Sequence, residues 1–180
     1  AVKLGLVNRN AEWGGGERWF LDGAIEFMRR GHEVVLHVAP RSSLARAAEF
    51  HEVTACFEAE QAAGRTHDVV LSNSPRDLRF ALGKEIGGEG ARHALRRGID
   101  RPLVDNFLRR GTWRRLSAIL VNSDATGETV RKSLHWFPRE RIGPTRVAGG
   151  PARPTGAAGG RARLPQGAAA GRAAPVRGGA

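Results

Sequence analysis

Apolar and polar positions along residues 1–142 follow two alternating patterns, short apolar runs and amphipathic stretches. The run at 68–72 is almost uninterrupted, as in a strand buried on both faces. Residues 17–30 instead carry apolar side chains at spacings of three and four, which favours a helix with one buried face. We expect strands at 3–7, 33–38, 53–57, 68–72, 92–96 and 118–121, and helices at 17–30, 75–83, 106–116 and 124–136. This order predicts an α/β fold with a single Rossmann-like open parallel sheet flanked by helices.

Residues at the expected helix ends support these assignments. Glu17 stands in the first turn of the first helix and Arg29-Arg30 in its last, where each charge complements the helix dipole, and Gly31 supplies the C-terminal cap. Before 75–83, Ser74 is a preferred N-cap and Pro75 is favoured at the first helical position. The helix ends are therefore encoded locally.

Residues 143–180 have a different composition. Of these 38 residues, 11 are Ala, 10 Gly, 6 Arg and 5 Pro, and none is acidic or aromatic. Such a segment cannot bury enough surface to offset a backbone ordering entropy of about 1–2 kcal/mol per residue. We therefore expect a folded domain over 1–142 and a disordered, low-complexity tail over 143–180. The net charge is +11 for the whole chain, and subtracting the six arginines leaves +5 for residues 1–142.

Several classes of protein are excluded by what the sequence lacks. Cys56 is the only cysteine, so a disulfide-stapled scaffold is ruled out and a reducing, cytoplasmic setting is expected. No stretch approaches the roughly 18 consecutive apolar residues of a transmembrane helix, and we expect no signal peptide. The histidines are scattered without metal-ligand spacing, so we expect no metal site and no cofactor.

A series of short segments occurs in an order that one enzyme family shares. The segments are Gly14–Arg18 opening the first helix, Arg30–Val34 closing it, Asp68-Val69-Val70, Arg96-Arg97-Gly98, Ala118–Val121 followed by Asn122-Ser123, and Pro138–Ile142. Their order and spacing are similar to the N-terminal, acceptor-side half of family 4 glycosyltransferases of the GT-B fold. The resemblance covers about residues 2–142 and implies that the chain is one half of such a fold.

The loop Gly14-Gly15-Gly16 is the first candidate binding element. Three glycines between a strand and a helix let backbone N–H groups approach a phosphate or sugar, and the helix N-terminus adds about half a positive charge. The loop lacks the G-x-G-x-x-G spacing of dinucleotide-binding proteins, which disfavours a dehydrogenase. A tight turn without a ligand is the alternative interpretation. In the family, this loop borders the cleft where acceptor and nucleotide sugar meet.

Polar residues at strand ends are the other candidates. Ser72 and Asn73 follow one expected strand and Asn122 and Ser123 another, at the carboxyl ends where open α/β sheets bind ligands. Helix capping alone also explains each pair.

Arg96 and Arg97 form a basic pair where related enzymes often carry a Thr-x-His sequence. This departure puts the usual donor-side contact in doubt. Guanidinium groups at this point can bind a phosphorylated or carboxylated acceptor bidentately, while a solvated basic loop is the alternative. The sequence assigns no catalytic residue.

The family's reaction transfers a sugar from a nucleotide-sugar donor to a lipid-linked or saccharide acceptor, as in the assembly of cell-envelope polysaccharide. Nothing after Ile142 resembles the donor-binding domain, and Gly143-Pro144-Thr145-Arg146 replace the family's last strand. We therefore expect that strand to be absent and the chain to be an inactive, truncated form. A frame shift in a high-GC gene and a genuine disordered tail both remain open. The alternative function is a non-catalytic anion- or nucleic-acid-binding module with a basic tail.

The resemblance also implies partners. These are a nucleotide sugar, bound only together with a donor domain, and a glycan or lipid-linked acceptor at the inner membrane face. We expect a cytoplasmic protein with peripheral contact to an anionic membrane, and do not expect nucleic acid as a partner.

Overall fold

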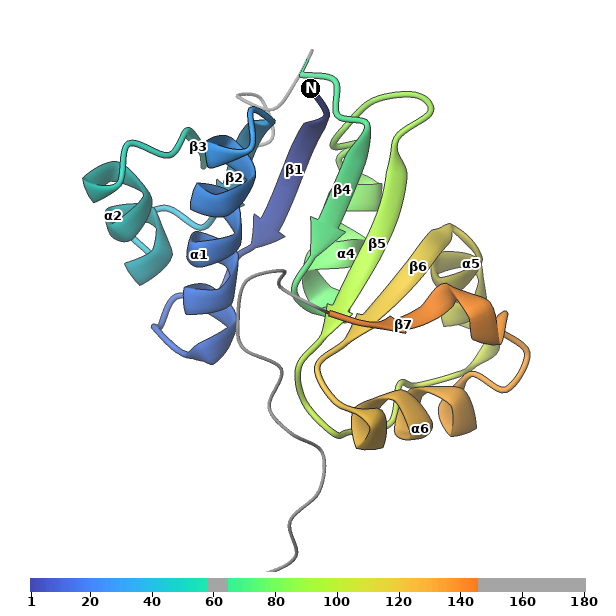
Figure 1. Cartoon of the computed structure of the whole chain (residues 1–180). Helices are drawn as coiled ribbons and strands as arrows, with labels where there is room; N and C mark the ends of the chain where they lie inside the picture. The colour runs from blue at the N-terminus through green and yellow to red at the C-terminus, as the bar shows by residue number, and fades with distance from the viewer. Residues whose placement is uncertain (58–64, 146–180) are drawn as a thin grey trace, which may run out of the picture. The chain divides into compact units, whose positions relative to one another are not determined.

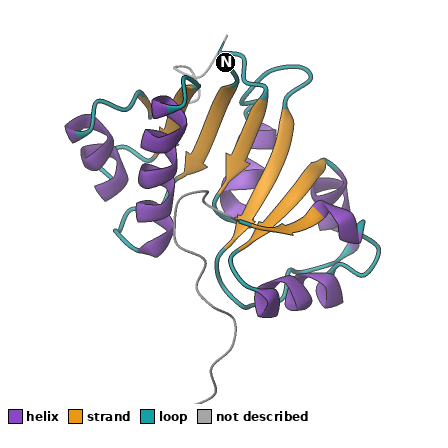
Figure 2. Ribbon diagram, in the orientation of Figure 1, coloured by secondary structure: helices purple, strands orange, loops and turns teal. Residues whose placement is uncertain are grey.

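A seven-stranded parallel sheet organises the computed structural model, which describes residues 1–57 and 65–145 (Figures 1 and 2). The strands are β1 (Lys3–Asn8), β2 (Glu33–Val38), β3 (Ala55–Cys56), β4 (Val69–Ser72), β5 (Arg92–Arg97), β6 (Leu116–Val121) and β7 (Ile142–Pro144). The helices are α1 (Gly15–Arg29), α2 (Ser43–Phe50), α4 (Pro75–Gly83), α5 (Phe107–Arg114) and α6 (Asp124–Ser133), with a 3-10 turn η1 (Arg139–Arg141). The predicted α/β class and Rossmann-like open sheet are confirmed.

The strand order, β3-β2-β1-β4-β5-β6-β7, contains one reversal. The chain builds outward from β1 to β3, then returns to place β4 on the other side of β1. Leu6 of β1 is accordingly in register with Leu36 of β2 and with Leu71 of β4. At such a reversal the loops that follow the two central strands lead to opposite faces, which opens a crevice at the carboxyl ends of the strands.

The two faces of the sheet bury separate hydrophobic clusters. Leu6 packs with α1 and α2 on one face, whereas its neighbour Val7 packs with Ala81 of α4 on the other. A third cluster joins α4, α5 and α6 around Leu95 of β5 and the fully buried Trp113. Helices therefore cover both faces, as the figures show, and the polar strand ends are left at the edge.

Local sequence sets the start and end of the helices around this edge. Glu17 lies in the first turn of α1, and Gly31 ends it with a φ of +82°, a conformation that favours glycine. Ser74 caps α4 by accepting a hydrogen bond from the backbone N–H of Asp77 at 3.2 Å. The Asp77 carboxylate in turn accepts a hydrogen bond from the backbone N–H of Arg9 at 3.0 Å, which ties the loop after β1 to the start of α4.

Most element predictions are confirmed, including the basic strand β5, with boundaries that move by a few residues. The clearest omission is α2, which the sequence analysis did not predict. Its Ser42 cap accepts a hydrogen bond from Ala45 N at 3.1 Å, and the buried residues are the short Ala45 and Ala48 beside Leu44. The helix has only eight residues and buries mainly small side chains, so its hydrophobic pattern in the sequence is weak. It therefore depends on packing against the sheet for its stability.

The expectation that the last strand is absent is wrong. β7 pairs in parallel with β6, with Ile142 in register with Ile119 and Pro144 with Val121. Ile142 is buried in the third cluster, and Thr145 N donates to Val121 O at 2.7 Å. A short edge strand needs only backbone pairing and one anchor, and it tolerates a proline. The sequence analysis missed β7 because the composition of the chain changes at residue 143, within the strand. The disordered tail was predicted over 143–180, and its first two residues instead belong to β7. Residues 146–180 lie outside the described residues, so the rest of that prediction and the division of the chain near 142 stay predictions.

Candidate functional site

A cavity of about 450 Å³ lies at the carboxyl ends of the central strands. The loops that follow β1, β4, β5 and β6 all contribute to it, which is the position that the strand reversal between β1 and β4 predicts for a ligand. Its lining residues are Asn10, Gly15, Gly16, Glu17, Asn73, Ser74, Arg96, Arg97, Gly98, Ile99 and Asn122.

Many of the predicted site residues meet at this cavity. Those that line it are Gly15, Gly16, Asn73, Arg96, Arg97 and Asn122. They come from the start of α1, the end of β5 and the loops after β4 and β6, and the sheet brings them together because parallel strands end at one edge. Their roles as ligand-binding residues remain predictions.

Gly14, Ser72 and Ser123 do not line the cavity. Gly14 is the N-cap of α1, and Ser123 caps α6 by accepting from Thr126 N at 3.2 Å. Ser72 is fully buried, and its hydroxyl oxygen has no hydrogen-bond partner among the described residues. For Ser123, helix capping is therefore the role that the structure shows.

Arg96 lines the cavity with only 9% of its surface exposed. Its Nη1 donates to Oδ1 of Asn73 at 3.1 Å, and its guanidinium lies 4.9 Å from the centre of the Trp19 ring. A Cβ at Gly98 would lie 2.8 Å from the same Nη1, so a side chain at that position would displace the guanidinium. Burial lowers the pKa of Arg96, an effect that the nearby Glu17 carboxylate opposes.

Arg97 is buried to a similar degree, 7% exposed, and is held by a different group. Its Nη2 donates to the backbone carbonyl of Arg101 at 2.7 Å. Burial lowers the pKa of Arg97, and the positive charge of Arg101 lowers it further. A guanidinium keeps its proton under such conditions, so two positive charges stand beside the cavity.

Glu17 was expected only to complement the helix dipole, yet it lines the cavity and is 4% exposed. Its Oε1 accepts hydrogen bonds from Nδ2 of Asn8 at 3.0 Å and from Nδ2 of Asn10 at 2.7 Å. The two amides hold the carboxylate in place at the start of α1. In the sequence, the signal for this arrangement is Asn8 at the end of β1 and Asn10 just after it, because they place amide donors close to the start of α1.

The two glycines at the start of α1 have different surroundings. A Cβ at Gly15 would meet no atom within 4 Å, whereas one at Gly16 would lie 3.0 Å from Nδ2 of Asn73. Gly16 therefore permits the close approach of α1 to the loop after β4. Gly15 leaves open space beside the first backbone N–H groups of the helix, which have no intrahelical partner.

Buried histidines meet elsewhere in the fold. His37 of β2 and His67, which precedes β4, are 2% and 6% exposed, with their Nε2 atoms 3.0 Å apart. One ring must donate and the other accept, so the accepting ring is neutral, and the two rings cannot both carry a proton on these facing nitrogens. Burial and the charges of His67, Arg65 and Arg9 lower the pKa of His37 to about 3. Among residues 1–57 and 65–145, no group of three or more His, Cys, Asp or Glu is arranged to hold a metal ion.

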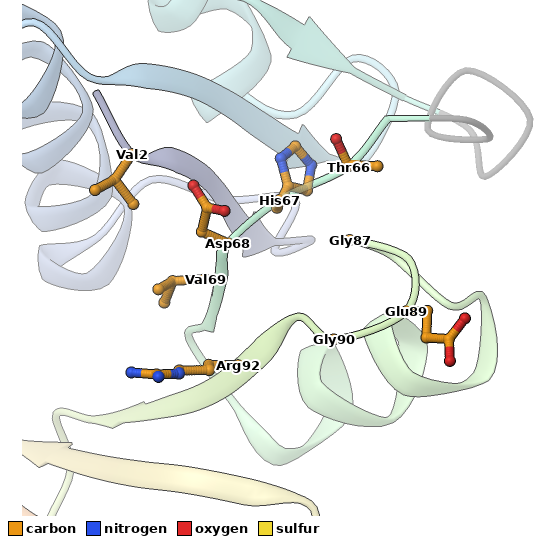
Figure 3. Close-up of a pocket in the computed structure, with 9 residues that line it drawn as sticks. All are labelled: Val2, Thr66, His67, Asp68, Val69, Gly87, Glu89, Gly90 and Arg92. Atoms are coloured by element: carbon orange, nitrogen blue, oxygen red, sulfur yellow. The ribbon is translucent and has the colours of Figure 1, made fainter.

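A second cavity, of about 500 Å³, lies at the opposite edge of the sheet, beside the amino ends of β4 and β5 (Figure 3). Its lining includes Asp68, Glu89 and Arg92, whose side chains Figure 3 shows pointing in different directions. Asp68 accepts a hydrogen bond from Lys3 N at 2.7 Å, which joins β1 to β4. No set of polar groups converges here as it does at the carboxyl edge.

Solved structures with a similar fold are glycosyltransferases. HepE from Anabaena in complex with UDP-glucose aligns with a TM-score of 0.60 and 13% identity, over 80% of this chain and 43% of that one. An alpha-glucosyltransferase in complex with UDP-glucose and DNA containing an abasic site aligns with a TM-score of 0.54 and 19% identity, over 79% and 42%. No protein-family model matches the sequence, and a search of curated proteins found no match.

These alignments define the class of the fold. The described domain has the Rossmann-like architecture of one half of a GT-B glycosyltransferase, as the sequence analysis predicted. The chain spans about two fifths of the length of these structural neighbours. Membership of family 4 within this class stays a prediction. Within the described ranges, no helix is long and apolar enough to cross a bilayer.

Proposed function

We propose that this chain is the acceptor-side half of a glycosyltransferase of the family 4 type, which transfers a sugar from a nucleotide-sugar donor to a saccharide or lipid-linked acceptor. One observation carries the proposal. The cavity at the strand reversal gathers the N-terminus of α1 and two buried arginines in a fold whose structural neighbours were solved with UDP-glucose.

The donor is expected to approach through the open space at Gly15. Its diphosphate carries the charge that free backbone N–H groups at a helix N-terminus attract. A side chain at Gly15 would enter that space without touching the rest of the fold. Substitution at this position therefore separates a loss of binding from a loss of folding.

The test is a titration of the ¹⁵N-labelled full chain with UDP-glucose, followed by NMR. We expect the amide signals of Gly15, Asn73 and Asn122 to move, and Gly15→Val to abolish the movement while the far-UV circular dichroism spectrum is retained. The matched control is Gly111→Val, which makes the same substitution in a helix at another position with no atom within 4 Å. Retained movement in Gly15→Val would show that Gly15 serves only the turn, and its loss in Gly111→Val as well would show a general effect of the substitution.

We also propose that the chain alone does not complete the transfer. Catalysis of this kind stabilises a diphosphate leaving group in a site shielded from water, and the family closes a second domain over the first for that purpose. Incubation of the purified chain with UDP-glucose and saccharide acceptors is expected to give no product. Turnover at an ordinary rate, about 1 per second or more, would contradict this part of the proposal.

A contact with an anionic membrane is proposed at the start of α5. Phe107 and Leu108 are 90% and 84% exposed, and Arg114 and Arg115 at the other end of the helix are also exposed. Apolar side chains that enter the acyl boundary beside arginines that face anionic headgroups are typical of an interfacial segment. A lipid-linked acceptor would reach the protein from this surface.

A further inference from the structure

The cavity at the carboxyl edge contains more positive than negative charge, because Arg96 and Arg97 line it together with a single carboxylate, that of Glu17. Neither Arg96 nor Arg97 forms an ion pair with a carboxylate among the described residues, and the Nε of each is buried without a hydrogen-bond partner. Buried arginines are almost always paired, because removing an unpaired charge from water is unfavourable. A stable fold that retains two such groups at one cavity indicates that a ligand supplies the missing charge.

The two guanidinium groups are held in position before any ligand arrives. Asn73 and the Trp19 ring fix Arg96, and the Arg101 carbonyl fixes Arg97. These contacts use one Nη of each side chain, and the other Nη forms no hydrogen bond with any of the described residues. Preorganised donors of this kind bind an anion with little further loss of side-chain entropy.

The balance of charge selects the class of anion. Two guanidinium groups and the N-terminus of α1 give about +2.5, and the buried Glu17 carboxylate reduces this to about +1.5. A phosphate monoester carries about −1.5 to −2 near neutral pH, which balances the site, whereas a carboxylate leaves it positive. The diphosphate of the donor also balances this charge, so the two are separated by the probes below. The tetrahedral oxygens of a phosphate also accept from several directions, as arginines and helix N–H groups on different walls require.

We propose that this cavity binds the phosphate monoester of the glycosyl acceptor, either a soluble sugar phosphate or a phosphate-bearing lipid headgroup. The inference rests on the proposed function, since it names the acceptor class of the same site.

The experiment is isothermal titration calorimetry of the full chain with matched probes. Glucose 1-phosphate carries the monoester, glucose lacks it, glucuronate replaces it with a carboxylate, and UDP-glucose carries a diphosphate that is esterified at both ends, with no phosphate monoester. We expect inorganic phosphate and glucose 1-phosphate to bind, and glucose and glucuronate to bind about tenfold more weakly or not at all. Sedimentation with vesicles that contain a phosphomonoester lipid, or the same lipid without it, distinguishes the headgroup from the soluble source.

The variants address each arginine separately. Arg97→Gln removes a charge, and Arg96→Lys keeps the charge but loses the planar fork, so each is expected to weaken phosphate binding about tenfold. Arg92→Gln is the control, because Arg92 is an exposed arginine at the other end of the same strand. Should a variant fold poorly, the phosphate-induced rise in unfolding temperature of the wild-type chain, compared with chloride at equal ionic strength, is a second measurement.

Three results would overturn the inference. Equal binding of glucuronate would show that any anion suffices. Tighter binding of UDP-glucose, lost in Arg97→Gln, would assign the arginines to the donor diphosphate. An equal effect of Arg92→Gln would show that only net charge is sensed. Failure of the proposed function has a different signature: UDP-glucose then moves no signal at Gly15, Asn73 or Asn122, while phosphate binding continues to depend on Arg96 and Arg97.

Discussion

The structure predicts how far the stability of the domain falls at acid pH because of the buried His37–His67 pair. In the unfolded chain a histidine titrates near 6.5, whereas the pKa of His37 in the fold is about 3, because burial and neighbouring positive charges oppose protonation. A lowered pKa means that the stabilising effect is complete above pH 6.5 and is lost as the pH falls below that value. The unfolded state then binds a proton that the folded state does not.

The size of the effect follows from this difference in pKa. At about pH 5, protonation favours the unfolded state by about 2 kcal/mol for His37 alone, and the slope approaches about 1.4 kcal/mol per pH unit. Burial also lowers the pKa values of His67 and His93, so these two histidines lower the free energy of unfolding further as the pH falls. A loss of this size is a large part of the stability of a small domain.

The assay is urea unfolding followed by tryptophan fluorescence at several pH values between about 7.5 and 4.5. His37→Gln keeps a group that can hydrogen-bond to His67 but does not titrate, so the pH slope should fall by up to about 1.4 kcal/mol per unit. His51→Gln makes the same substitution at an exposed position. An unchanged slope in His37→Gln would refute the conclusion that burial holds this histidine neutral.

Three further predictions concern packing, charge and membrane contact. Gly5→Ala places a Cβ 2.6 Å from Cδ2 of His67 and should destabilise the domain by about 1–3 kcal/mol in urea unfolding. If the double variant with His67→Ala lost as much stability as the two single variants added together, this steric origin would be contradicted. Arg97→Met should raise the free energy of unfolding by about 1 kcal/mol or more, because it removes a buried unpaired charge, and a clear loss of stability would show that the guanidinium is structural. Replacing Phe107 and Leu108 by Ser should release the chain from anionic vesicles in a sedimentation assay, whereas retained binding would place the contact elsewhere.

Local sequence determined much of this fold. Uninterrupted apolar runs such as 69–72 specify buried parallel strands, and Ser74 and Ser123 specify helix starts, because these preferences act within a few residues. The same logic located much of the cavity, since the carboxyl ends of parallel strands share one edge and the polar residues found there were visible in the sequence. It failed for α2 and β7, whose segments carry weak patterns of their own and depend on an existing sheet.

Only the tertiary structure decided which charges are buried and which residues meet. Arg96 and Arg97 resemble a solvated basic loop in the sequence. The fold instead buries them beside the start of α1 and the loops after β4 and β6, where they lose water without forming an ion pair among the described residues. His37 and His67 seem unrelated along the chain, but the pairing of β2, β1 and β4 and the missing side chain of Gly5 bring their rings into contact. Burial and long-range contact depend on the packing of the whole sheet, and no local pattern of residues encodes that packing.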